Sequence, residues 1–153
     1  MSASDYEIEA VLDEGRARRV LRARRRRDGL PVVVKHLRPG VLGLAHRVEQ
    51  EFNLLRRISA PEVVGALALD DWHGAPALIL AVVDGTPLGA WIRRPRGPAD
   101  LLERLHFALG LTRALAVVHA AGVLHRDIKP SNIVVTPDRR VVLIDFSAAT
   151  LAR

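Results

Sequence analysis

The stretch HRDIKPSN occupies residues 125–132, and Asp145 follows within the tetrapeptide IDFS after a segment whose pattern predicts a β-hairpin. Asp127 is a carboxylate that can accept a proton from a hydroxyl group. Lys129 can place a cation beside a transferring phosphoryl group. Asn132 and Asp145 carry the oxygen ligands that Mg²⁺ prefers. The two blocks together predict a site for phosphoryl transfer from a nucleotide.

These blocks resemble two motifs of the protein kinase superfamily. HRDIKPSN is similar to the catalytic loop H-R-D-x-x-x-x-N, and IDFS resembles the metal-binding element D-F-G. The resemblance implies that Asp127 is the catalytic base and that Asn132 and Asp145 are the metal ligands. Lys129 indicates the serine/threonine class rather than the tyrosine class. The implied cofactors are ATP and Mg²⁺, and the implied partners are ATP and a protein with a serine or threonine hydroxyl.

A second signal lies upstream, where VVVK ends at Lys35. This segment resembles the kinase strand V-A-I-K, whose lysine contacts the α- and β-phosphates. Glu51 resembles the helix glutamate that pairs with this lysine. Glu49 is the nearest rival, but two residues of separation turn its side chain about 200° around a helix. We therefore expect a pair between Lys35 and Glu51.

The segment ALILAVVDG, residues 77–85, resembles the strand that leads to the adenine pocket. By this resemblance Leu80 lies behind the adenine ring, and the backbones of Ala81 and Val83 form hydrogen bonds with it. Val134, which follows the catalytic loop, is expected to form the floor beneath the ring.

The loop that covers the phosphates departs from the family pattern. Kinases have G-x-G-x-x-G-x-V there, whereas residues 13–20 read DEGRARRV, so that Gly15 and Val20 are the matching positions. Because glycine allows the backbone to approach phosphate closely, we expect weaker nucleotide binding than in an ordinary kinase. Ser147 similarly replaces the glycine of the metal-binding element.

The periodicity predicts an α+β, protein kinase-like fold. Residues 1–83 are expected to form a small antiparallel-sheet N-lobe with one helix, and residues 84–153 an incomplete helical C-lobe. The expected strands are 6–12, 20–26, 32–34, 63–70, 77–83, 133–135 and 141–144. The expected helices are 44–58, 88–92 and 99–120, with a loop at 93–98. In the last helix, Leu101, Leu105, Ala108, Leu109, Leu115 and Val118 are expected to share an apolar face.

Composition narrows the classes of function. The chain has 153 residues and a formal charge of +6. Because it contains no cysteine, disulfides and thiolate chemistry are excluded. The arginine cluster Arg22–Arg27 raises the possibility of a nucleic-acid patch. No aromatic residue is interleaved with it for base stacking, and Asp28-Gly29 predicts a hairpin turn directly after it. We therefore expect no nucleic-acid partner. The absence of a targeting signal or a long apolar run predicts a cytoplasmic protein without a membrane partner.

Two interpretations of the function stay open. One is a serine/threonine protein kinase, and the alternative is a pseudokinase, an ATP-binding regulatory module of a larger signalling protein. A related enzyme that phosphorylates a small molecule is less consistent with Lys129 and its KPSN string. The chain resembles kinase domains at the front of multidomain bacterial kinase/ATPase/sensor proteins. Since little sequence follows Asp145, we expect the 153-residue chain alone to be inactive on protein substrates.

Overall fold

The computed structural model describes residues 3–38, 44–94 and 100–152. The chain divides into two compact units. The first comprises Met1–Arg56 and Gly65–Val82, and the second comprises Arg57–Val64 and Val83–Arg153. Within the described residues, no helix combines the length and the apolar character needed to cross a bilayer.

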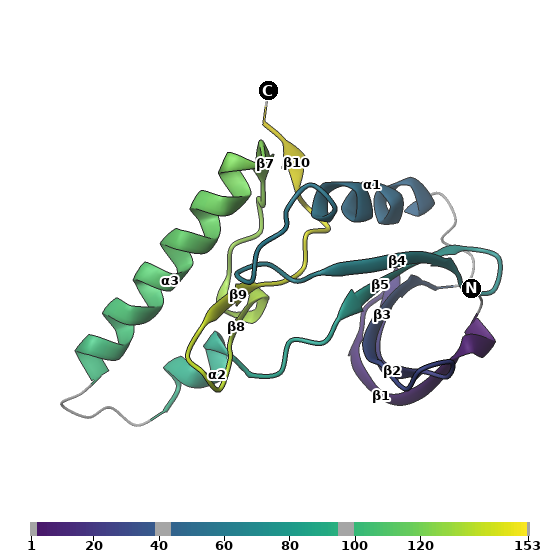
Figure 1. Cartoon of the computed structure of the whole chain (residues 1–153), viewed down its shortest axis with the longest axis horizontal. Helices are drawn as coiled ribbons and strands as arrows, with labels where there is room; N and C mark the ends of the chain where they lie inside the picture. Colours follow the sequence, from purple (N-terminus) through teal and green to yellow (C-terminus); the bar gives the residue numbers. More distant parts are fainter. Residues whose placement is uncertain (1–2, 39–43, 95–99, 153) are drawn as a thin grey trace. The chain divides into compact units, whose positions relative to one another are not determined.

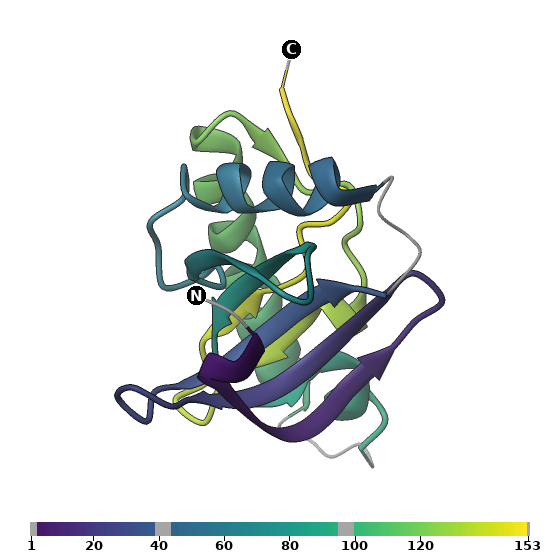
Figure 2. The same cartoon turned by 90° about the vertical axis from the view of Figure 1, so that its right-hand side faces the viewer.

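The first unit is built on a five-stranded antiparallel sheet with the strand order β1-β2-β3-β5-β4. Figures 1 and 2 show that β1, β2 and β3, which pair side by side, are strongly curled. The strands are β1 (Tyr6–Glu14), β2 (Arg18–Arg25), β3 (Pro31–Leu37), β4 (Ala66–Asp71) and β5 (Pro76–Ala81), and the short 3-10 helix Ala3–Asp5 precedes them. The predicted strands of this unit are present, although their ends differ by a few residues.

Two tight turns set the register of these strands. Gly29 has φ 70° and donates its N–H to the Arg25 carbonyl at 2.8 Å. His73 and Gly74 both have positive φ, 55° and 82°, which is the conformation of a type I′ hairpin turn. The sequence predicts both turns, because Asp28-Gly29 and His73-Gly74 each place a glycine where left-handed backbone is needed.

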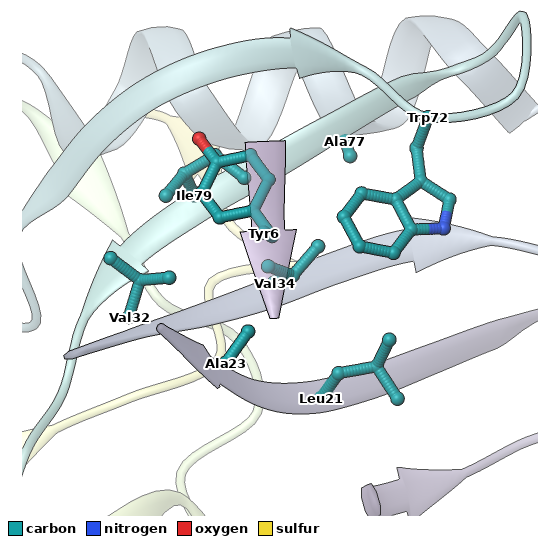
Figure 3. Packing of buried hydrophobic residues seen from close by; sticks show 8 residues of the cluster. All are labelled: Tyr6, Leu21, Ala23, Val32, Val34, Trp72, Ala77 and Ile79. Carbon is teal, nitrogen blue, oxygen red and sulfur yellow. The ribbon is translucent and has the colours of Figure 1, made fainter. Parts of the chain in front are cut away.

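One buried apolar cluster of the first unit lies on one face of the sheet (Figure 3). Val32 pairs with Ala23 on one side, and Val34 pairs with Leu21 on one side and Ile79 on the other. Residues that pair across antiparallel strands share a face, so these side chains meet in one layer. The buried cluster consists of Tyr6, Leu21, Ala23, Val32, Val34, Trp72, Ala77 and Ile79.

Helix α1 (Ala45–Leu55) packs against β4 and β5. It ends three residues before the predicted Ile58, which is buried beyond the helix. Apolar spacing along the helix predicts that Val48, Phe52 and Leu55 share its buried face. Glu51 is buried together with Val48 and Leu55, whereas Phe52 is only half-buried. The apolar pattern alone did not predict that a charged residue would be on the buried side.

The second unit contains two small antiparallel sheets and two helices. One sheet has the order β6-β8-β9, and the other pairs β10 with β7. The elements are β6 (Thr86–Pro87), α2 (Leu88–Ile92), α3 (Asp100–Ala120), β7 (Val123–Leu124), the 3-10 helix Pro130–Asn132, β8 (Ile133–Val135), β9 (Val141–Leu143) and β10 (Thr150–Leu151). Residues 95–99, which include most of the predicted loop 93–98, lie outside the described part of the chain.

The predicted strand at 63–70 was wrong in its first residues. Val64 donates its N–H to the Leu143 carbonyl at 3.0 Å, and Leu143 donates to the Glu62 carbonyl at 2.8 Å. Val63 forms an isolated parallel bridge with Leu143. Because this backbone pairs with β9, strand β4 begins only at Ala66, after Gly65. Such a long-range pairing leaves no local signal in the sequence.

Helix α3 is apolar on two sides. Phe107, Ala114 and Val118 are buried, whereas Leu105 and Leu109 are 57% and 51% exposed. The single apolar face predicted for this helix was therefore wrong: Val118 belongs to the buried side and most of the leucines to the exposed side. The exposed leucines are Leu101, Leu102, Leu105 and Leu109.

Candidate active site

A buried ion pair joins strand β3 to helix α1. The Lys35 Nζ donates to the Glu51 Oε1 at 2.7 Å, and the two side chains are 8% and 4% exposed. The structure thus brings together the lysine and the glutamate that the sequence pairs, while Glu49 is exposed. Removing one partner of a buried ion pair leaves an uncompensated charge, so each residue fixes the other in place.

The strand register places the other predicted residues of this sheet around Lys35. Val20 and Leu78 are its neighbours on β2 and β5. Val33, two residues before Lys35 on β3, pairs with the buried Leu80. Because side chains alternate along a strand, Val20, Lys35 and Leu80 all lie on the face opposite the Figure 3 cluster.

The Ala81 side chain lies on the other face of the sheet, together with the Figure 3 cluster, since Ala81 pairs with Val32. Its N–H already donates to the Gly65 carbonyl at 2.8 Å, so its carbonyl oxygen is the group that it can offer a ligand. Val83 belongs to the second unit and is half-buried. The hydrogen bonds of both backbones with adenine stay predictions.

The loop between β1 and β2 is a short turn held by polar contacts. Gly15 donates its N–H to the Arg18 carbonyl at 3.0 Å. The Glu14 carboxylate accepts a hydrogen bond from Arg38 at 2.7 Å and forms an ion pair with Arg19 at 2.8 Å. Gly15 is outside the left-handed region, and an added Cβ would meet only ordinary contacts. Nothing in the local packing therefore requires glycine at this position.

The arginine cluster of β2 is matched by carboxylates. Arg24 lies 2.9 Å from Glu9, and Arg25 contacts Asp28 at 2.6 Å. The hydrogen bond from Arg25 lowers the pKa of Asp28 to about 2. This pairing agrees with the interpretation of the cluster as a strand face that leads into a turn.

In the second unit, three residues of the segment HRDIKPSN form one hydrogen-bonded group. The Asp127 Oδ2 accepts from Lys129 Nζ at 2.6 Å and from Asn132 Nδ2 at 2.9 Å. Asn132 is buried and also donates to the Asp127 carbonyl at 3.0 Å. The hydrogen bond from Lys129, with a smaller contribution from Asn132, lowers the pKa of Asp127. The carboxylate is thus ionised at neutral pH, as a proton acceptor must be.

A backbone hydrogen bond places Asn132 beside the segment that carries Asp145. Ile144 donates its N–H to the Asn132 carbonyl at 2.9 Å, at the end of the β8–β9 pairing. Asp145 has φ 61°, an uncommon conformation for a non-glycine residue. Because Asn132 uses its amide nitrogen on Asp127, its amide oxygen is the atom available for a metal. An amide oxygen and a carboxylate are suitable ligands for Mg²⁺, so the residues fit this ion.

A family model described as protein kinase domain matches residues 6–153. The chain belongs to the protein kinase family. It is 36% identical over 104 residues to a probable cAMP-dependent protein kinase catalytic subunit of Encephalitozoon cuniculi, covering 67% of this chain and 32% of that protein. It is 31% identical over 156 residues to calcium/calmodulin-dependent protein kinase type 1B of Rattus norvegicus, covering 97% and 44%. A probable serine/threonine-protein kinase of Streptomyces coelicolor is 30% identical over 152 residues, covering 94% and 22%.

The chain spans less than half the length of these curated relatives. The predicted α+β, protein kinase-like fold is confirmed. It consists of an antiparallel N-lobe sheet with one helix and the beginning of a helical C-lobe.

The sequence analysis did not predict the buried contacts of His125. Its side chain is 2% exposed, and its ring packs on Phe146 with a centroid distance of 4.5 Å. Nδ1 accepts the Asp127 N–H at 3.3 Å, and Nε2 donates to the Ile144 carbonyl at 3.2 Å. His125 thereby joins the loop that carries Asp127 to the segment that carries Asp145 and Phe146. Its place at the start of HRD was the available signal.

Gly85 was also missed. A Cβ at this position would lie 2.4 Å from the Val135 carbonyl oxygen and 2.7 Å from the Val134 Cγ1. The chain before β6 therefore approaches β8 so closely that only glycine fits. Val134 is buried at this contact, and its place beneath the adenine ring stays a prediction.

Proposed function

We propose that this chain is the ATP-binding part of a serine/threonine protein kinase, which transfers the γ-phosphoryl group of Mg·ATP to a protein hydroxyl. The observation that carries the proposal is the hydrogen-bonded group of Asp127, Lys129 and Asn132, with its ionised carboxylate. We assign residues 1–83 to the N-lobe and residues 84–153 to the beginning of the C-lobe. We also propose a cytoplasmic location and a protein substrate.

In the N-lobe, Lys35 would contact the α- and β-phosphates while Glu51 holds its ammonium group in place. The buried 2.7 Å contact supports this role, because it leaves the lysine few other conformations. Leu80, Ala81, Val83 and Val134 would surround the adenine ring, and Gly15 and Val20 would lie over the nucleotide. The shared sheet face of Val20, Lys35 and Leu80 supports a common ligand for these three residues.

In the C-lobe, Asp127 would accept the proton of the substrate hydroxyl as this attacks the γ-phosphorus. Lys129, which contacts the same carboxylate, would stabilise negative charge on the phosphoryl oxygens. Asn132 and Asp145 would hold Mg²⁺, which supplies positive charge to the β- and γ-phosphates when it is bound. The 2.9 Å backbone bond between Ile144 and Asn132 supports this shared ligand role.

The names of the relatives support the serine/threonine class. The mycobacterial serine/threonine-protein kinase PknA is 40% identical over 72 residues, which cover 47% of this chain. Lys129 agrees with this class.

A pseudokinase is the second candidate, and two observations favour it. The turn at Gly15 is tied down by Glu14, Arg19 and Arg38 rather than built from glycines. Ser147 replaces the glycine after Phe146. In this alternative the domain binds Mg·ATP and regulates other parts of a signalling protein without transferring phosphate.

Phosphate transfer separates the two candidates. The full-length gene product is expressed and purified. It is then incubated with radiolabelled Mg·ATP and a generic protein acceptor. We expect incorporation that Asp127→Asn reduces at least a hundredfold, as loss of a general base typically does. Nucleotide binding without incorporation that depends on Asp127 would instead establish the pseudokinase.

A further inference from the structure

The residue after Phe146 forms a contact that glycine at this position cannot form. Ser147 donates its Oγ–H to the Asp145 Oδ1 at 2.8 Å. The Ser147 N–H points to the same oxygen at the longer distance of 3.4 Å. A glycine would retain only the longer contact. The hydroxyl therefore forms the shorter of the two hydrogen bonds from Ser147 to this carboxylate oxygen.

The backbone around this contact is well supported. Phe146, between the two residues, is 1% exposed and packs on His125. Ala149 donates its N–H to the Phe146 carbonyl at 3.0 Å. These contacts fix the backbone from which Ser147 projects, while the serine side chain itself is exposed. The hydroxyl thus approaches Asp145 from a position that buried neighbours determine.

A hydrogen bond to the Asp145 side chain is favourable because of the backbone conformation of this residue. Its φ of 61° lies in the left-handed region, which aspartate tolerates when its side chain forms local hydrogen bonds. A carboxylate on a short side chain can rotate to present either oxygen to a ligand. A hydrogen bond to Oδ1 restricts that rotation and distinguishes the two oxygens.

We propose that Ser147 is a positioning residue, which holds Asp145 Oδ1 so that Oδ2 is presented to the divalent cation of the nucleotide complex. The proposal rests on the proposed function, because it takes Asp145 to be a metal ligand. Ser147, which replaces the glycine of the D-F-G motif, would then contribute to metal binding. In this role Ser147 acts through Asp145 and does not itself touch the metal.

The test is cation binding rather than turnover. Mn²⁺ is titrated into the protein at a saturating concentration of AMP-PNP, and the free ion is followed by electron paramagnetic resonance against a protein-free blank. We expect Ser147→Ala and Ser147→Gly to weaken Mn²⁺ binding about three- to tenfold, the effect of losing one ordinary hydrogen bond at an exposed position. Ser147→Thr keeps the hydroxyl and should bind Mn²⁺ within twofold of the unaltered protein.

Controls separate positioning from a role in folding. Since the Ser147 side chain is exposed, the melting temperatures of the three variants should agree with that of the unaltered protein, and so should their affinity for AMP-PNP without metal. Equal Mn²⁺ binding in Ser147→Ala and the unaltered protein would overturn the proposal, as would equal losses in Ser147→Ala and Ser147→Thr. Asp145→Asn tests the underlying function separately: if it leaves Mn²⁺ binding unchanged, the metal site assigned to Asp145 is wrong.

Discussion

Among single residues, Lys35 and Glu51 have the most demanding environment. Both side chains are almost fully buried, and each charge is compensated by the other at 2.7 Å. The desolvation of two charges makes such a pair a weak source of net stability, but loss of one partner is costly. We therefore expect the pair to be required for the stability of the first unit.

Lys35→Met tests this requirement. The substitution leaves the Glu51 carboxylate buried without its cation, so we expect the free energy of unfolding to fall by about 3 kcal/mol. Urea denaturation followed by circular dichroism gives the value. Glu49→Gln on the exposed side of the same helix is the matched control and should change stability by less than about 0.5 kcal/mol. Equal effects of the two substitutions would show that the pair is not buried as described.

The ionisation of Asp127 provides a second test at this scale. Because the hydrogen bond from Lys129 lowers the pKa of Asp127 below 3.8, its ionised form stabilises the fold above that pH, and this contribution disappears as the pH falls through the lowered pKa. Lys129→Met should raise the pKa of Asp127 towards its ordinary value. Carbon-13 NMR titration of the carboxyl groups measures the change. An unaltered titration curve in Lys129→Met would contradict the assignment of Lys129 as the main cause.

Among the elements, the close approach of the segment before β6 to β8 depends on one glycine. Gly85→Ala would place a methyl group 2.4 Å from the Val135 carbonyl oxygen, so the backbone must shift. We expect the free energy of unfolding to fall by about 1–3 kcal/mol. Gly89→Ala in helix α2 is the matched control, since its Cβ would meet Pro130 at an ordinary 3.5 Å. That control should be neutral or slightly stabilising, because alanine favours helix. Denaturant unfolding of both variants decides the matter.

The local sequence pattern predicted the helices and strands better than it predicted which distant segments they pair with or pack against. Alternation and the turn residues Asp28-Gly29 and His73-Gly74 were sufficient for the N-lobe hairpins, because both are local signals. The pairing of Val63 and Val64 with Leu143 and the two apolar sides of α3 were missed, since both depend on distant segments.

In the candidate site, too, the residues could be predicted from local sequence, whereas some of their contacts could not. Its residues were predicted from motif and spacing, including the choice of Glu51 over Glu49. The hydrogen bonds of His125 and Ser147 were missed, because they arise from a backbone path that the motif does not describe.

On the scale of the whole molecule, the exposed leucines of α3 determine how the chain behaves alone. Leu105 and Leu109 lie one helical turn apart and are both more than half exposed. A contiguous apolar surface of this kind favours association. We expect the 153-residue chain to self-associate and Leu105→Lys with Leu109→Lys to reduce that association without loss of stability. Sedimentation velocity measures it. Ile8→Lys, on the exposed side of β1, is the control, and an equal effect there would argue against α3 as the associating surface.

We propose that Lys35 of the first unit and Asp145 of the second unit each take part in binding Mg·ATP. Calorimetric titration of the protein with Mg·ATP tests it most directly. The account predicts binding that Lys35→Met and Asp145→Asn each weaken at least about tenfold, the effect of losing one charge-assisted contact. Binding that is indifferent to both substitutions, or no binding at all, would contradict it.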